Sequence, residues 1–264
     1  MVSGSDVWTS GEPYERYIGR WSRLVAGEFV RWLGVPRGRR WLDVGCGTGA
    51  LTETLLAVAE PTEVVGLDAS ESFVAHARRA VVDKRARFVL AAADELPFGD
   101  EAFDAVVSGL VLNFVPDPAA AIAEAARVVR AGGVVAAYLW DYADGMRPLR
   151  YFWDAAAAVD PSSAKLDEGR RFPLARPAAL AELFGSGLEG VETRAIDVPT
   201  RFRDFDDYWS PFLGGQGPAP AYAVSLAEEP RTALRKRLRA TVPARADGSI
   251  ELVARAWAVR GVRR

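Results

Sequence analysis

Cysteine and histidine each occur once in the 264-residue sequence, as Cys46 and His76. One cysteine excludes an internal disulfide, and one cysteine with one histidine excludes the thiolate and imidazole clusters that bind zinc. We therefore expect no disulfide framework and no metal site. Only three of the 33 basic residues are lysines, and with the many alanines this favours a bacterial gene.

Long hydrophobic runs are also missing. No apolar stretch approaches the roughly 18 residues of a membrane span, and the start "MVSGSDVWTSGEPYER" lacks the pattern of a secretory signal. We expect a cytoplasmic protein with no membrane partner. The net charge of −2 gives no general attraction to nucleic acid. The arginines of residues 228–242 are spread around a predicted helix, so we interpret them as a solvated face.

Short apolar runs alternate with amphipathic segments along most of the chain. The runs predict strands at residues 39–45, 62–68, 86–94, 102–110, 134–140, 188–198 and 249–262. The amphipathic segments predict helices within residues 14–34 and at 50–60, 70–82, 117–133, 147–159, 176–187 and 228–242. This alternation is typical of an α/β protein with a doubly wound, mostly parallel sheet.

Three glycines directly follow the first predicted strand, in "WLDVGCGTGA" at residues 41–50. A run from Gly45 to Ala50 fits the G-x-G-x-x-A pattern of a phosphate- or nucleoside-binding turn that opens a helix. Asp68 ends the next strand about 20 residues later, where a carboxylate suits a ribose diol. NAD and S-adenosylmethionine both carry that diol, so these features leave both cofactors open.

The stretch "AAADELPFGDEAFDAVVSGLVLNFVPDP" at residues 91–118 distinguishes between these two possible cofactors. It places Asp94 after the third strand, where a carboxylate can accept a hydrogen bond from the exocyclic amine of adenine. Together with "LDVGCGTG" and "VVGLDAS", it resembles the class I S-adenosylmethionine-dependent methyltransferases. The similarity is greatest to the subgroup with the ubiquinone and menaquinone C-methyltransferases, and it covers residues 13 to about 140.

The resemblance implies a Rossmann-like sheet of seven strands whose last strand is antiparallel, and S-adenosylmethionine as the cofactor. The methionine part of the cofactor would lie over the glycine turn, where a Cβ would collide with it. The residues that the resemblance places around this part are Gly45, Gly47 and Gly49 under it, Asp43 and the Ser108 carbonyl with Gly109 at its ammonium group, and Tyr17 and Arg20 at its carboxylate.

The nucleoside part of the cofactor would meet a second group of residues. Asp68 would accept both ribose hydroxyls. Ala69 and Ser70 would edge the adenine, and Asp94 would meet its amine, with Glu95 beside it.

We expect one methyltransferase domain over residues 1–264. Its parts are N-terminal cap helices at 13–35, a cofactor-binding core at 36–140 and a mostly helical lid at 200–248, between the last two strands. Long loops are usually functional or disordered, and this one is rich in aromatic residues. A substrate wall and ordinary core packing explain the aromatics equally well. The wall would comprise Trp140, Tyr151, Tyr208 and Trp209.

The leading hypothesis is methyl transfer to an O, N or C atom of a small organic molecule, by a monomer or homodimer. No general base stands out, and the candidates are Tyr17, Asn113 and Asp141. A fold relative that catalyses another reaction, or only binds the cofactor, is the alternative. An NAD-dependent oxidoreductase would need a Tyr-x-x-x-Lys or histidine pair that is not evident. We interpret Cys46 as a small residue that fits between the glycines rather than a reactive thiol. We interpret His76 as a packed or surface residue rather than a general base.

Overall fold

The computed structural model describes residues 19–215 and 217–264, which divide into two compact units. The unit that we call the sheet unit comprises residues 22–139, 174–196 and 257–264. The described part of the other, the helical unit, comprises residues 19–21, 140–173 and 197–256 without 216.

The described residues form a seven-stranded sheet with the strand order β3-β2-β1-β4-β5-β7-β6. The β1–β2, β1–β4, β2–β3 and β4–β5 pairs are parallel, and β7 is antiparallel. The predicted fold class is confirmed. The strands are β1 (Arg40–Val44), β2 (Glu63–Asp68), β3 (Ala86–Leu90), β4 (Phe103–Gly109), β5 (Val129–Trp140), β6 (Glu189–Phe202) and β7 (Ile250–Val262).

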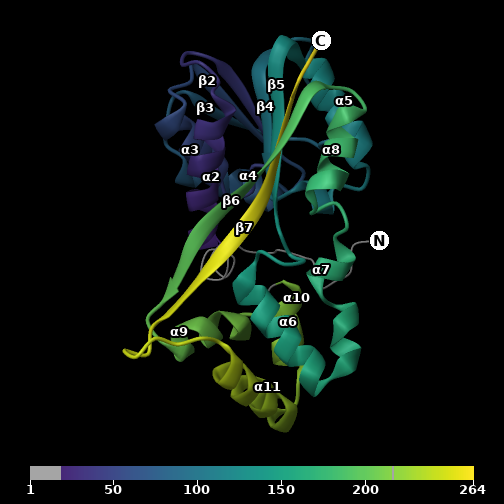
Figure 1. Cartoon of the computed structure of the whole chain (residues 1–264). Helices are drawn as coiled ribbons and strands as arrows, with labels where there is room; N and C mark the ends of the chain where they lie inside the picture. The colour runs from purple at the N-terminus through teal and green to yellow at the C-terminus, as the bar shows by residue number, and fades with distance from the viewer. Residues whose placement is uncertain (1–18, 216) are drawn as a thin grey trace. The chain divides into compact units, whose positions relative to one another are not determined.

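Helices cover both faces of the sheet, which explains why its central strands are apolar runs rather than alternating patterns. In β1, the four residues from Trp41 to Val44 are all buried. Figure 1 shows α2 (Arg20–Leu33), α3 (Ala50–Val58) and α4 (Glu71–Ala80) on one side, and α5 (Pro118–Val128) and α8 (Pro177–Gly185) on the other.

The strand order reverses at β1. From β1 the chain adds β2 and β3 on one side, and then returns to place β4 and β5 on the other side. In open α/β sheets a ligand binds outside the carboxyl ends of the strands at such a reversal. The carboxyl ends of β1 and β4 therefore mark the place for a site, and the glycine turn follows β1 directly.

Helix α5 is shorter than the sequence pattern predicts. Asp117 caps its start by accepting a hydrogen bond from the N–H of Ala120. The helix ends at Val128 rather than at the Gly132–Gly133 pair, because Val129 turns into the sheet and is completely buried. The two glycines lie inside β5, where the pairing with β4 shifts register.

The helical unit includes the predicted insertion between β6 and β7. Its helices are α6 (Arg147–Val159), α7 (Glu168–Arg171), α9 (Phe205–Trp209), α10 (Pro218–Ser225) and α11 (Glu228–Thr241), with the 3₁₀ turns η4 (Pro161–Lys165) and η5 (Ser210–Leu213). The insertion is thus helical over most of its described length. The role of a lid stays a prediction.

Aromatic side chains of the insertion pack against α6 within the helical unit. The rings of Phe152 and Phe212 stack with centroids 4.5 Å apart. Tyr208 is fully buried, and its hydroxyl donates a 2.8 Å hydrogen bond to the Pro148 carbonyl. These aromatics therefore find an apolar surface inside their own unit.

A buried charged cluster joins α6 to α7. The guanidinium of Arg150 donates two hydrogen bonds to the Asp167 carboxylate, at 2.8 and 2.7 Å. The indole N–H of Trp153 donates to Glu168, which is 3% exposed. Burial raises the pKa of Glu168 from 4.5 to about 7.

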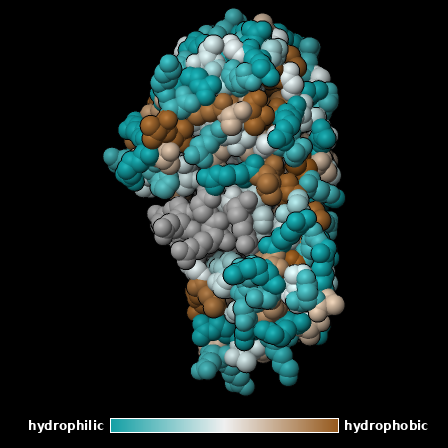
Figure 2. Space-filling view, turned by 90° about the vertical axis from the view of Figure 1, so that its left-hand side faces the viewer, coloured by the Kyte–Doolittle hydropathy of each residue, from teal (hydrophilic) through white to brown (hydrophobic). Residues whose placement is uncertain are grey.

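Apolar side chains on the outer surface are scattered. Figure 2 shows small apolar patches that are separated by hydrophilic residues on the face it presents. Among the described helices, none has both the length and the apolar character needed to cross a bilayer.

The raised pKa of Glu168 predicts a pH-dependent stability. The folded protein keeps this proton to a higher pH than the unfolded chain, so the stabilisation is complete below the unfolded pKa of 4.5 and is lost as the pH rises through about 7. We expect up to about 3 kcal/mol of unfolding free energy to depend on this group. Denaturant titrations between about pH 5 and about pH 8 should show a shallower fall for Glu168→Gln than for wild type. Glu229→Gln, at an exposed position in α11, is the control, and equal slopes for wild type and Glu168→Gln would contradict the assignment.

Candidate functional site

The turn from β1 to α3 is built from three glycines in left-handed backbone conformations. Their φ values are +74° at Gly45, +52° at Gly47 and +95° at Gly49. A Cβ on Gly45 would lie 2.5 Å from Val111, and one on Gly49 would lie 2.7 Å from Val81. The protein's own packing therefore already requires two of these glycines. A Cβ on Gly47 meets nothing among the described residues within 4 Å, so this glycine faces the open side of the turn.

Asp43 is buried at the carboxyl end of β1 with one of its oxygens unused. Its Oδ2 accepts a 2.7 Å hydrogen bond from the Thr52 hydroxyl. Its Oδ1 has no hydrogen-bond partner among the described residues. Burial raises the pKa of Asp43 to about 7, and the nearby charge of Asp68 adds to that increase. A cation beside Oδ1 would supply both the missing partner and the missing countercharge.

Asp68 ties the end of β2 to the glycine turn. Its Oδ2 accepts a 2.9 Å hydrogen bond from the N–H of Gly47, and its Oδ1 accepts a 2.8 Å bond from the N–H of Ser70. A carboxylate offers about four lone-pair positions, so hydroxyl donors can still bind. Ala69 is exposed beside it, and the Ser70 hydroxyl caps α4 through the N–H of Phe73.

Ser108 and Gly109 end β4 in the neighbouring position. Asp43 pairs with Val107 across the two strands, so Ser108 lies one residue further toward the same edge. The Ser108 hydroxyl is buried and has no partner among the described residues, as is true of Oδ1 of Asn113 in the following turn, η3 (Leu112–Phe114). Between them, Leu110 adopts a φ of +65°, a conformation that is costly for leucine and often found at functional sites.

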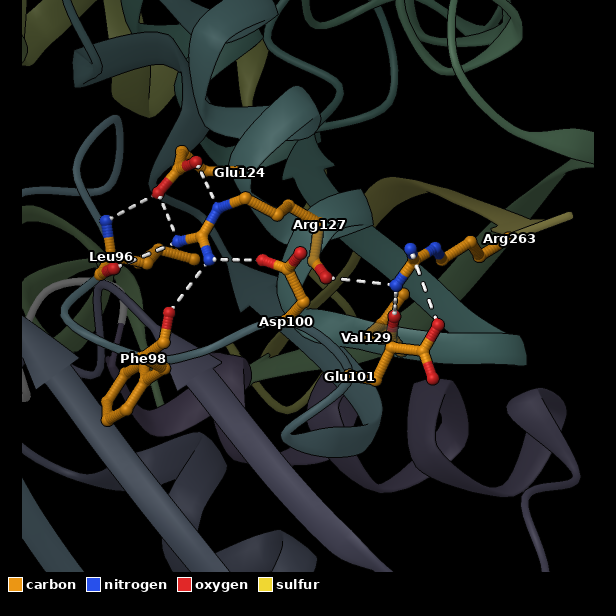
Figure 3. A network of polar contacts seen from close by, with 8 residues as sticks. All are labelled: Leu96, Phe98, Asp100, Glu101, Glu124, Arg127, Val129 and Arg263. Atoms are coloured by element: carbon orange, nitrogen blue, oxygen red, sulfur yellow. Dashed lines mark hydrogen bonds and ion pairs between the residues drawn. The ribbon is translucent and has the colours of Figure 1, made fainter.

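Asp94 and Glu95 lie exposed in the loop after β3. The following residues are held by a network around Arg127 of α5, which Figure 3 shows. Its guanidinium donates to the Leu96 and Phe98 carbonyls and to Asp100 and Glu124. Glu124 in turn accepts a 2.9 Å bond from the N–H of Leu96.

The carboxyl terminus extends the same network. Arg263 donates to the main-chain carbonyls of Arg127 and Val129 and lies 3.6 Å from Glu101 (Figure 3). The loop that carries Asp94 is thereby fixed at its C-terminal side.

The remaining predicted cofactor residues are not placed by the structure. Tyr17 lies outside the described residues, and so does the side chain of Arg20, whose backbone begins α2. Their roles stay predictions.

The predicted substrate-wall residues and Asp141 belong to the helical unit. Trp140 is 1% exposed, and its indole N–H has no partner among the described residues. Asp141 is buried and accepts a 3.2 Å bond from the N–H of Asp144. Tyr151 is half-buried beneath the guanidinium of Arg147, while Tyr208 and Trp209 belong to the aromatic core. The structure supports core packing for these last two, and their part in a substrate wall stays a prediction.

Cys46 and His76 are both at least partly buried. Cys46 is buried in the turn, and burial, reinforced by Asp43 and Asp68, raises its thiol pKa far above the ordinary value. His76 is half-buried within α4. No group of acidic, histidine or cysteine side chains in the described part of the chain could hold a metal ion.

Sequence reasoning missed three residues that shape this site. Thr52 occupies one oxygen of Asp43, Val111 fills the space beside Gly45, and Arg127 holds the loop after Asp94. Thr52 had a usable signal, since it lies one turn into the helix that the glycine turn opens. The other two act across long sequence separations that a single sequence does not reveal.

Residues 42–137 match the family model of a methyltransferase domain. The demethylmenaquinone methyltransferase of Staphylococcus aureus is 40% identical over 105 residues, which cover 39% of this chain and 44% of that protein. Over these residues the chain is similar to class I S-adenosylmethionine-dependent methyltransferases. It spans less than half the length of the curated relatives that it matches.

Several solved structures share the fold of this chain. The YcgJ protein of Bacillus subtilis has a TM-score of 0.59 at 19% identity, covering 91% of this chain and 98% of its own. Phosphoethanolamine N-methyltransferase 2 of Haemonchus contortus, in complex with S-adenosylhomocysteine, has a TM-score of 0.59 at 15% identity and covers 96% of this chain and 57% of its own. The [4+2]-cyclase SpnF has a TM-score of 0.56 at 20% identity, with coverages of 99% and 88%. The matches support S-adenosylmethionine as the cofactor.

The two kinds of glycine in the turn predict different responses to alanine. Gly45→Ala should lower the free energy of unfolding by about 2–4 kcal/mol, because a strained φ adds to a collision with Val111. Gly47→Ala should cost only about 1–2 kcal/mol, from its φ alone. Urea denaturation of both variants measures this difference. Adding Val111→Ala should partly rescue Gly45→Ala and not Gly47→Ala, and a purely additive double variant would contradict the contact.

Proposed function

We propose that the protein transfers a methyl group from S-adenosylmethionine to an O, N or C atom of a small organic molecule. The observation that carries the proposal is the polar edge at the ends of β1, β2 and β4. There Asp43 keeps one buried carboxylate oxygen without a partner among the described residues, and Asp68 keeps spare acceptor capacity beside the glycine turn. The partial match to the S. aureus methyltransferase supports it.

The residues of the sheet unit fit the two ends of this cofactor. Asp43 and the strand end at Ser108 would hold the methionine ammonium, since both present acceptor atoms at the same edge of the sheet. Asp68 would take the ribose hydroxyls, and Gly47 would allow the cofactor to approach the backbone closely. Asp94 and Glu95 would meet the adenine from their exposed loop.

The cofactor supplies an activated methyl group on a positively charged sulfur. The protein's contribution is to hold that methyl group in line with the acceptor atom and to keep water away. Such positioning is worth up to about 7–11 kcal/mol in favourable intramolecular reactions. A base is needed only if the acceptor must lose a proton, and Asn113, Asp141 and Tyr17 stay candidates for that step.

A reaction other than methyl transfer is the second candidate. Its specific support is the [4+2]-cyclase SpnF, whose solved structure shares this fold. The distinction lies in the product, since only a methyltransferase moves the labelled methyl group to an acceptor.

Direct binding tests the proposal first. Calorimetry with the full chain should show binding of S-adenosylmethionine and S-adenosylhomocysteine, and weaker binding of NAD. Asp68→Ala should lose about 2–3 kcal/mol of binding free energy for both methionine-derived ligands, because charge-assisted hydrogen bonds to hydroxyls disappear. His76→Ala serves as the matched control and should bind as wild type does.

Mass spectrometry with methyl-labelled cofactor and a panel of acceptors then tests the transfer. Tighter binding of NAD would overturn the cofactor. Tight binding of the methionine-derived ligands with no labelled product from any acceptor would favour the second candidate.

The buried carboxyl of Asp43 predicts a pH-dependent affinity for the cofactor. Its pKa of about 7 leaves it largely protonated in slightly acid solution, while a neighbouring ammonium favours the carboxylate. Affinity for S-adenosylhomocysteine should therefore rise between about pH 5.5 and about pH 7.5, by at most about tenfold per pH unit, and level off above the pKa. Calorimetry in two buffers of different ionisation enthalpy should also detect proton release.

Asp43→Asn should bind more weakly at neutral pH and lose most of the pH dependence. Glu229→Gln, at an exposed position in α11, is the control and should keep the pH dependence. The same pH dependence in Asp43→Asn and wild type would contradict the role of Asp43.

A further inference from the structure

An open cleft in the helical unit lies between α11 and the segment from α9 to α10. Its volume is about 280 Å³, and its lining residues are Trp209, Leu213, Val224, Arg231, Thr232 and Arg235. We propose that this cleft, the α11 cleft, binds a small organic anion with a short apolar tail. All of its lining residues belong to one compact unit.

The apolar wall of the α11 cleft is unusually exposed for this protein. Leu213 is 47% exposed and Val224 is 42% exposed, and both are among the few large hydrophobic side chains that the described chain leaves in solvent. They come from different elements, η5 and α10, yet line the same cleft with Trp209. An apolar tail in the cleft would remove the exposed surface of Leu213 and Val224 from water.

The polar wall is formed by one side of α11. Arg231 and Arg235 lie one helical turn apart, with Thr232 beside Arg231, so their side chains project from the same side of the helix. Arg235 is already occupied, since it lies 2.7 Å from the carboxylate of Asp206. Arg231 is half-buried and has no ion-pair partner among the described residues.

The apolar and the basic wall of the α11 cleft together indicate which kind of ligand it binds. Arg231 has no ion-pair partner among the described residues, and the hydroxyl-bearing Thr232 lines the cleft beside it. A carboxylate or phosphate matches guanidinium geometry and would form charge-assisted hydrogen bonds there. Pockets for drug-sized ligands have volumes of roughly 300–1,000 Å³, so the cleft of about 280 Å³ fits a smaller molecule. Its occupant is therefore a short amphiphilic anion rather than an inorganic ion or a neutral lipid.

Calorimetry with octanoate as the probe tests this site on the full chain without cofactor. Octanoate should bind, while acetate, which keeps the head group, and 1-octanol, which keeps the chain, should each bind at least about tenfold more weakly. These factors correspond to the loss of one charge-assisted hydrogen bond or of the buried tail. If acetate bound as tightly as octanoate, the cleft would recognise only the anionic head group. If 1-octanol bound as tightly, it would recognise only the apolar chain. Either result overturns the proposal.

Two variants locate the binding in the α11 cleft. Arg231→Gln should weaken octanoate binding by about tenfold, whereas Arg237→Gln, an exposed arginine of the same helix outside the cleft, should bind as wild type does. Val224→Trp should block binding by filling the cleft. Thermal unfolding checks that each variant is folded. Unchanged octanoate binding in folded Arg231→Gln and Val224→Trp would overturn the site. Because no cofactor is used, neither result depends on the proposed methyl transfer.

Discussion

The hydrogen bond from the N–H of Gly47 to Asp68 is the contact on which the candidate site depends. It fixes the glycine turn after β1 to the end of β2 at 2.9 Å. The turn can reach that position only because its glycines adopt positive φ values. With the turn in place, α3 begins where Thr52 can donate to Asp43, and the open side of Gly47 is left beside two carboxylates. The glycine turn therefore determines the backbone path of the site, the positions of its carboxylates and the space beside them.

That arrangement is electrostatically incomplete in the protein alone. Two carboxylates lie close to one another. The more buried one has a pKa raised to about 7, and one of its oxygens has no partner among the described residues. Buried polar groups are normally paired. A structural carboxyl would be expected to find an arginine, as Asp167 does with Arg150 in the helical unit. Asp43 has no such arginine among the described residues. A cationic ligand is the simplest source of the missing partner and countercharge.

Local sequence patterns predicted the parts of this structure that short-range chemistry determines. The alternation of strands and helices along the chain and the helical insertion after β6 both follow from residues close in sequence. The features that the sequence did not predict arise from packing between segments that are distant in sequence. The collision of a Cβ on Gly45 with Val111 and the early end of α5 at a buried valine depend on partners that no local pattern identifies.

The glycine turn shows how a correct residue can be predicted for an incomplete reason. The motif suggested that all three glycines make room for a cofactor. In the structure, Gly45 and Gly49 make room for Val111 and Val81, whereas a Cβ on Gly47 would meet none of the described residues. A glycine motif therefore combines two demands, since the turn must first pack against its own sheet unit before any ligand can approach it. Substituting its three positions would consequently affect stability and binding in different proportions, and a motif match alone does not separate the two.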